Sequence, residues 1–120
     1  SIALVDPKNG QTIESSKEPY TVVVSLKHPN EYSWIRVYAD PIGQGSRQFI
    51  GQQNGPSSVF QTFEWTLPTA GSYALSAEGM TKAGAAVKTA GVIVKIMSAS
   101  DTHTSEGQEL FVPNNSLNLF

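Results

Sequence analysis

The sequence predicts an all-β fold, an antiparallel β-sandwich of about seven strands with Greek-key connections. Three observations predict it. Short segments of alternating apolar and polar residues recur at spacings of roughly ten residues, separated by turns rich in Gly, Pro, Asn and Ser. No stretch shows the apolar period of a helix. Residues 68–77, PTAGSYALSA, place a tyrosine two residues after a glycine at a tight corner and then alternate.

The first strands are expected at residues 2–5, which end at the turn sequence of residues 6–10, and at residues 20–27, which are rich in β-branched residues. Between them, Thr12 and Ile13 are expected to form an edge strand. Alternate positions of the strand at 20–27 share the face expected to be buried, namely Tyr20, Val22, Val24 and Leu26.

Residues 28–31 turn the chain into the next strand, at residues 34–39. Its inward positions are Ile35, Val37 and Ala39. Its outward positions are Trp34, Arg36 and Tyr38, which therefore share one face. Residues 48–51 are expected to form a short edge strand after the loop of residues 40–45.

Residues 59–66 alternate again. The set expected to face the core is Val59, Gln61, Phe63 and Trp65, because it ends in a large aromatic residue and leaves Glu64 in water. This register leaves Phe60 on the polar side without an explanation.

The closing strands follow the glycine corner, with Tyr73, Leu75 and Ala77 on the core face of the first of them. Val87 and the alternating Val92, Val94 and Ile96 complete the sheet. The predicted core comprises Val22, Val24, Leu26, Ile35, Val37, Phe63, Trp65, Tyr73, Leu75, Val92 and Val94.

The character of the sequence changes after Ile96. Residues 98–109 are polar and aperiodic, and residues 110–120 become apolar again. We therefore expect an immunoglobulin-like β-sandwich over residues 1–97, followed by a polar linker and an apolar C-terminal tail over residues 98–120. The tail is expected to begin a following domain, to dock back on the sandwich, or to bind a partner.

Composition and charge narrow the function classes. The 120 residues carry a net charge of −2 and 15% charged residues, and they include no cysteine. No basic stripe is available for a nucleic-acid backbone, and no apolar stretch is long enough for membrane insertion. Disulfides and thiol chemistry are excluded. A surface rich in neutral polar residues is common in exported β proteins, so we expect a secreted, periplasmic or cell-surface location.

With its strands placed, the chain resembles bacterial immunoglobulin-like (Big-type) modules, which occur as accessory domains of exported multidomain proteins. The resemblance covers about residues 2–96. It rests on these segments: Ile2-x-Leu4-x-x-Pro7-x-Asn9-Gly10-x-x-Ile13, Ile35-x-Val37-Tyr38-Ala39-Asp40 with Ile50-Gly51, Phe63-x-Trp65, Ala70-Gly71-x-Tyr73-x-Leu75-x-Ala77, and Ala83-Gly84. It implies a structural role for Tyr73, whose ring would pack in the core while its hydroxyl bonds nearby backbone.

The candidate ligand-binding residues are Trp34, Arg36 and Tyr38. Planar rings can cover the apolar face of a sugar, and an arginine can bond its hydroxyls, so the three could form a platform for a polysaccharide. Tyr32 could extend that surface. The alternative is that these large side chains pack under a loop, on the tail or on a neighbouring domain.

Metal and catalytic sites have little support in the sequence. The acids that could hold calcium are Asp6, Glu31, Asp40, Glu78 and Asp101, but no Asp-x-Asp-x-Asp run supplies the six to eight oxygens that calcium takes. The histidines are His28 and His103, one in a turn and one in the expected linker. No nucleophile-elbow motif is present. We expect no cofactor, no metal site and no enzyme activity.

Three functions are consistent with these observations. The first is a non-catalytic accessory or spacer module whose partners are neighbouring domains of the same protein. The second is a carbohydrate-binding module that uses the Trp34–Arg36–Tyr38 face. The third is a protein–protein interface module in which an edge strand or the tail pairs with another chain.

Overall fold

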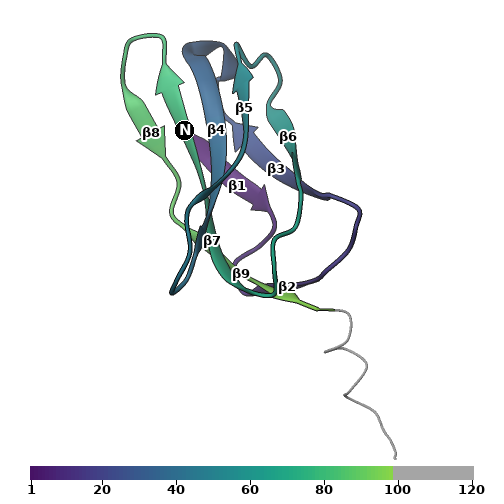
Figure 1. The fold of residues 1–120 in the computed structure, drawn as a ribbon. Coiled ribbons are helices and arrows are strands. Elements are labelled where there is room, and N and C mark those ends of the chain that lie inside the picture. The colour runs from purple at the N-terminus through teal and green to yellow at the C-terminus, as the bar shows by residue number, and fades with distance from the viewer. Residues whose placement is uncertain (99–120) are drawn as a thin grey trace, which may run out of the picture.

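A computed structural model describes residues 1–98 of the chain, and it shows two β-sheets facing each other (Figure 1). The strands are β1 (Ile2–Asp6), β2 (Gln11–Glu14), β3 (Tyr20–Leu26), β4 (Tyr32–Pro41), β5 (Gln48–Asn54), β6 (Phe60–Trp65), β7 (Gly71–Thr81), β8 (Ala86–Lys88) and β9 (Val92–Met97). A single 3₁₀ turn, η1 (Pro29–Glu31), is the only helical element of these residues. The predicted all-β sandwich is confirmed.

The smaller sheet has the strand order β1-β3-β6, and the larger sheet has the order β2-β9-β7-β4-β5, with β8 also paired to β7. Every pair is antiparallel except β2–β9, which is parallel. This one parallel pair arises because the chain leaves the smaller sheet after β1 and continues in the same direction along the edge of the larger sheet.

Nine strands appear where about seven were expected. The edge strand expected at Thr12 and Ile13 is β2, and residues 7–10 carry the chain to it from β1 in the other sheet. Residues 89–91 divide the last expected strand into β8 and β9. There the hydroxyl oxygen of Thr89 accepts a hydrogen bond from the backbone nitrogen of Ala77, so a side chain substitutes for one backbone bond of the ladder.

The core lies between the sheets, and the predicted core residues are buried there except Val92, which is half-buried against it. Alternation places Val22, Val24 and Leu26 inside from β3, each with no exposed surface. The core also contains residues that the predicted set omits: Ile13, Tyr32, Ala39, Ala77 and Ile96.

The buried face of β6 is the one expected, but the strand begins one residue later than expected. Gln61, Phe63 and Trp65 point into the core and are at most 7% exposed. Val59 was expected beside them, and this was wrong. It precedes the strand and is 51% exposed. Phe60 lies on the outer face with 60% of its surface exposed.

Tyr32 was expected to extend the outer aromatic surface, and this was wrong as well. It is buried, with 2% of its surface exposed. The pairing of β4 with β7 shifts by one residue between Tyr32 and Trp34, so Ser33 is the extra residue of a bulge. An extra residue reverses the alternation, and Tyr32 therefore points to the opposite face from Trp34.

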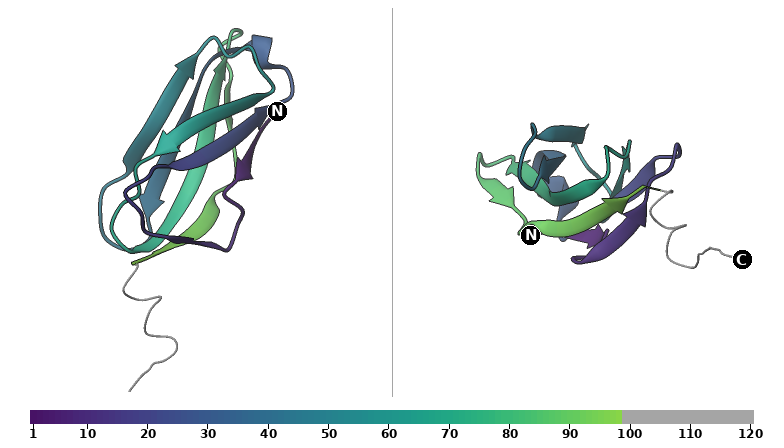
Figure 2. Two further views of the ribbon diagram at one scale, coloured as in Figure 1. Left: turned by 90° about the vertical axis from the view of Figure 1, so that its right-hand side faces the viewer. Right: turned by 60° about the horizontal axis from the view of Figure 1, so that its bottom comes forward.

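The two ends of the described chain lie toward opposite ends of the sandwich (Figure 2). The carbonyl of Ser1 accepts a hydrogen bond from Lys27, next to the end of β3. The last strand, β9, ends at Met97 beside Ser15, at the other end of the molecule. The linker and tail expected over residues 98–120 lie outside the described residues, apart from Ser98. None of residues 1–98 belongs to a helix long and apolar enough to span a membrane.

Candidate functional site

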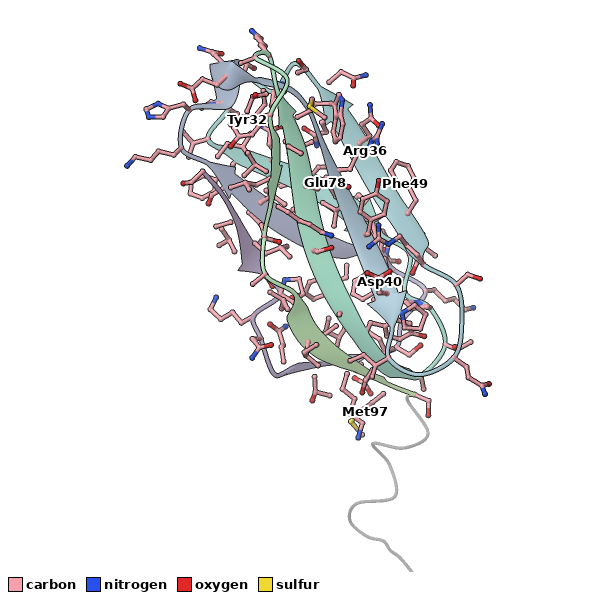
Figure 3. All side chains as sticks on the ribbon, turned by 90° about the vertical axis from the view of Figure 1, so that its left-hand side faces the viewer. Tyr32, Arg36, Asp40, Phe49, Glu78 and Met97 are labelled. Carbon is pink, nitrogen blue, oxygen red and sulfur yellow. The ribbon has the colours of Figure 1, made fainter. Side chains whose placement is uncertain are left out.

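The outer face of β4 carries Trp34, Arg36 and Tyr38, as the period of two predicts. All three are half-buried, while Ile35 and Val37 between them are fully buried on the inner face. The neighbouring β5 adds its own outward side chains to this surface, and Figure 3 shows Arg36, Phe49 and Asp40 along it. We call this surface, formed by Trp34, Arg36, Tyr38, Asp40, Arg47, Phe49, Gln52 and Asn54, the β4–β5 face.

One half of the β4–β5 face is a continuous row of contacts. The guanidinium of Arg36 lies over the ring of Trp34, with its carbon 3.9 Å from the ring centroid. Its Nε donates a hydrogen bond to Oε1 of Gln52 at 2.6 Å. The Nε2 of Gln52 then donates to Oδ1 of Asn54 at 2.7 Å. Hairpin pairing creates this row, because Arg36 stands opposite Gln52 and Trp34 opposite Asn54.

The other half of the face is organised around Tyr38. Its ring packs against Phe49 with centroids 5.8 Å apart and planes tilted by 58°. The guanidinium of Arg47 lies over the Tyr38 ring at 4.4 Å. Arg47 also forms a bidentate ion pair with Asp40, with Nε and Nη2 donating at 2.7 and 3.1 Å. These hydrogen bonds hold the pKa of the Asp40 carboxyl below its usual value, although burial opposes them.

This packing changes what the face can do chemically. A neutral sugar stacks on an open ring face, but here guanidinium groups cover one face of Trp34 and one face of Tyr38. Phe49, 55% exposed, is the more open ring, and it is not among the residues that the sequence pattern predicts for this surface. The sequence holds no signal for it, because Phe49 stands opposite Tyr38 only through the register shift between Val37 and Tyr38.

Tyr73 lies in the glycine corner, opposite Pro41 at the end of β4, and it points to the inner face of the larger sheet. Its hydroxyl donates a hydrogen bond to the carbonyl oxygen of Thr69 at 2.7 Å. Its ring packs edge-on against Trp65, with centroids 6.4 Å apart. The tyrosine therefore joins the corner to the core, on the side of the larger sheet opposite to the β4–β5 face.

The acids considered for calcium are dispersed. Asp6 accepts a hydrogen bond from Tyr20, Asp40 is paired with Arg47, and Glu78 stands opposite Lys88 on the outer face. No group of three or more His, Asp or Glu side chains within residues 1–98 is arranged to hold a metal ion. His28 directly precedes η1. Asp101 and His103 lie outside the described residues.

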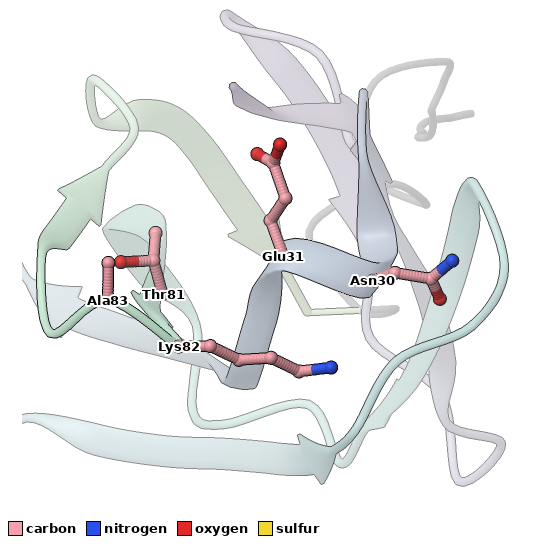
Figure 4. A pocket seen from close by; sticks show the side chains of 5 residues that line it. All are labelled: Asn30, Glu31, Thr81, Lys82 and Ala83. Carbon is pink, nitrogen blue, oxygen red and sulfur yellow. The ribbon is translucent and has the colours of Figure 1, made fainter.

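A shallow pocket of about 480 Å³ lies between η1 and the β7–β8 turn (Figure 4). Its lining residues are Asn30, Glu31, Thr81, Lys82 and Ala83. The backbone nitrogen of Lys82 donates to the carbonyl of Glu31 at 2.8 Å, which fixes the two segments against each other. In Figure 4 the carboxylate of Glu31 and the ammonium of Lys82 point in different directions, so the pocket does not focus its charges on one point.

Comparison with known proteins supports the fold. No protein-family model matches the sequence, and no curated protein sequence matches it either. The structure is similar to a solved structure of the fibronectin(III)-like modules of CbhA from Clostridium thermocellum, with a TM-score of 0.64 and 16% sequence identity. The match covers 82% of this chain and 46% of that one, so the chain spans about half the length of the structure it matches. At this identity the likeness establishes the fold alone, a fibronectin(III)-like, immunoglobulin-like β-sandwich.

Proposed function

We propose that this chain is a non-catalytic accessory module, of the bacterial immunoglobulin-like (Big-type) kind, which separates neighbouring domains of a secreted, periplasmic or cell-surface protein. The observation that carries the proposal is the position of the chain ends. Ser1 is bonded near the end of β3, and β9 leaves from the opposite end of the sandwich. Domains joined to these two ends are held apart by the sandwich.

The separation follows from strand length. The longest strand, β7, has 11 residues, and at about 3.3 Å per residue it spans roughly 35 Å. The strands of both sheets run along this direction and pack on a shared core. The distance between the two chain ends is therefore fixed as long as the sandwich is folded. A flexible linker has no fixed end-to-end distance.

The test is to place the complete chain between a donor and an acceptor fluorescent protein and to measure energy transfer. We expect a single transfer efficiency that stays constant as urea is added and changes only when the sandwich unfolds, as followed by tryptophan fluorescence. The control replaces residues 1–97 with a Gly/Ser linker of the same length. A transfer efficiency that drifts gradually with urea in both proteins would show that the module sets no fixed spacing.

The second candidate function is carbohydrate binding on the β4–β5 face. The observation that favours it is the gathering of three aromatic rings and several amide and guanidinium groups on one sheet face, with Phe49 55% exposed. We expect saturable binding in a panel of soluble and insoluble polysaccharides, lost in Trp34→Ala. Phe60→Ala is the matched control, because Phe60 is an exposed ring on the other sheet. Equal loss in both variants would place the binding elsewhere.

A further inference from the structure

The two arginines of the β4–β5 face are stacked alike but bonded differently. Arg47 uses both Nε and Nη2 on the carboxylate of Asp40, so its charge is already neutralised by a bidentate partner. Arg36 uses only Nε, and its acceptor is the neutral amide of Gln52. The two terminal amino groups of Arg36 have no hydrogen-bond or ion-pair partner among residues 1–98.

Arg36 is also held in place. Its guanidinium lies 3.9 Å above the Trp34 ring, and the bond from Nε to Gln52 fixes its rotation about that stack. Much of the conformational entropy that a free arginine loses on binding is therefore already lost in the folded chain. A planar guanidinium with two unpaired amino groups matches a carboxylate, which it can grip with two parallel hydrogen bonds.

The charges around Arg36 leave it available to an anion. Glu78 stands opposite Arg36 across the β4–β7 ladder, and Lys88 stands opposite Glu78 on its other side. Glu78 therefore has one cation opposite it on each neighbouring strand. On the β5 side Arg36 meets only the neutral amides of Gln52 and Asn54.

We propose that the β4–β5 face binds a carboxylate-bearing polysaccharide, with Arg36 holding the carboxylate of a uronic acid unit and the amides of Gln52 and Asn54 bonding its hydroxyls. This inference rests on the second candidate function and names its ligand class. An acidic peptide would also offer carboxylates. Peptides, however, bind sheets mainly through free backbone groups at an edge, whereas this face presents side chains above strands that are already paired.

The experiment compares polygalacturonic acid with its fully methyl-esterified form, which keeps the sugars and removes the charge. Binding to the full chain is measured by isothermal titration calorimetry. We expect saturable binding of the acid and loss of binding on esterification. Arg36→Gln weakens binding by about tenfold or more, because hydrogen bonds to a charged group are lost. Arg36→Lys weakens it comparably, because the charge remains but the fork and the stack do not.

Lys95→Gln is the matched control, since it also removes one positive charge, from an exposed position on β9 outside the β4–β5 face. It should change binding less than about threefold, as expected for an exposed charge that does not touch the ligand. Thermal unfolding of each variant checks that the sandwich is still folded. Poly-glutamate is the third ligand, and it should bind more weakly than the polysaccharide.

Four results would overturn the inference. The first is that the methyl ester binds as tightly as the acid, and the second is that Lys95→Gln loses as much affinity as Arg36→Gln. The third is that Arg36→Lys keeps full affinity. The fourth is that poly-glutamate binds as tightly as the polysaccharide, with the same dependence on Arg36. Failure of the inference and failure of the parent proposal are distinguishable. If the chain binds neutral polysaccharides but not polygalacturonic acid, the carbohydrate-binding function is retained and this ligand class is refuted. If it binds no polysaccharide at all, both proposals are refuted.

Discussion

Tyr73 shows how one side chain can fix a turn to a core. Its hydroxyl reaches back four residues to the Thr69 carbonyl, while its ring lies 7% exposed against Trp65. Both ends of this hydrogen bond belong to one short segment, and the left-handed φ of 150° at Gly71 lets the chain bend between them. Because the relation is local, the sequence motif was sufficient to predict a structural role.

Replacing Tyr73 with phenylalanine keeps the ring and removes the bond. We expect Tyr73→Phe to lower the free energy of unfolding by about 1–2 kcal/mol, the usual contribution of such a bond. Urea unfolding followed by tryptophan fluorescence measures it. Tyr38→Phe is the control, because the Tyr38 hydroxyl has no hydrogen-bond partner within residues 1–98. If the two variants unfold at the same urea concentration, the corner bond contributes nothing.

Tyr32 and Gly79 form a contact that the sequence did not reveal. A β-carbon placed on Gly79 would lie 2.8 Å from Cδ1 of Tyr32 and 2.9 Å from its Cε1. The buried tyrosine ring therefore packs directly on the backbone of β7. The contact depends on the Ser33 bulge, which turns Tyr32 inward, and a single extra residue leaves no mark in an alternating pattern.

Gly79→Ala should destabilise the fold by about 1–3 kcal/mol, because the ring is buried and has little room to move. Gly91→Ala is the matched control. A β-carbon there meets only Cβ of Ala74 at 3.8 Å, an ordinary contact, so a neutral or slightly stabilising effect is expected. Chemical denaturation of both variants gives the comparison. A stabilised Gly79→Ala protein would mean that the Tyr32 ring shifts freely.

At the scale of elements, alternation predicted most of the fold. It assigned the buried faces of β3, β4, β6 and β7, since a strand with one face in the core must repeat every two residues. It also placed Trp34, Arg36 and Tyr38 on one outer face. Their contacts with Gln52, Phe49 and Arg47 could not be predicted. These depend on the register of the β4–β5 hairpin, which shifts at a bulge beside Tyr38.

The seam between β5 and β6 is closed by glutamine side chains. The amide of Gln53 donates to the Thr62 carbonyl at 2.6 Å, and that of Gln48 donates to the Thr66 carbonyl at 3.2 Å. Gln48 also accepts from the indole Nε1 of Trp65 at 3.0 Å. The carbonyls of Thr62 in β6 and of Thr66 directly after it, which would otherwise be open to another strand, are thus occupied. Strand addition by a partner, part of the interface hypothesis, would have to displace these amides here.

Gln48→Leu should cost about 1–3 kcal/mol of stability, because Trp65 is fully buried and its indole N–H would lose its acceptor. The matched control is Gln44→Leu in the β4–β5 loop, an exposed position where we expect a change within about 0.5 kcal/mol. Urea denaturation measures both. Equal stabilities would mean that water or another group replaces the glutamine at the indole.

At the scale of the whole molecule, the two sheets are joined where β1 gives way to β2. The hydroxyl of Tyr20, at the start of β3, donates to Asp6 and accepts from the Gln11 amide at 2.9 Å. Nearby, the side-chain oxygen of Asn9 accepts from the backbone nitrogen of Ile93 at 2.9 Å. The Tyr20 cluster, formed by Tyr20, Asp6 and Gln11, links β1 and β3 of the smaller sheet to β2 of the larger one, and the bond of Asn9 adds β9. Its members are too far apart in sequence to be grouped by pattern alone.

The Tyr20 cluster makes stability depend on pH in the alkaline range. Burial raises the pKa of the Tyr20 hydroxyl above its usual value, and the hydrogen bond to Asp6 raises it further, although Gln11 opposes this. The folded state therefore favours the neutral phenol. Its contribution is fully present below the unfolded pKa of about 10, and it is lost as pH rises through the raised pKa of the folded chain.

We therefore expect the difference in unfolding free energy between the unmodified chain and Tyr20→Phe to be constant near neutral pH. It should shrink as pH rises past about 10, because only the unmodified chain then loses a favourable phenol. Urea unfolding at a series of pH values measures the difference. The pKa of Tyr32 is also raised by burial, but that group is present in both proteins and cancels. A difference that stays constant to the highest pH at which both chains fold would show that Tyr20 titrates as it does when unfolded, and that its burial and its bond to Asp6 do not favour the neutral phenol.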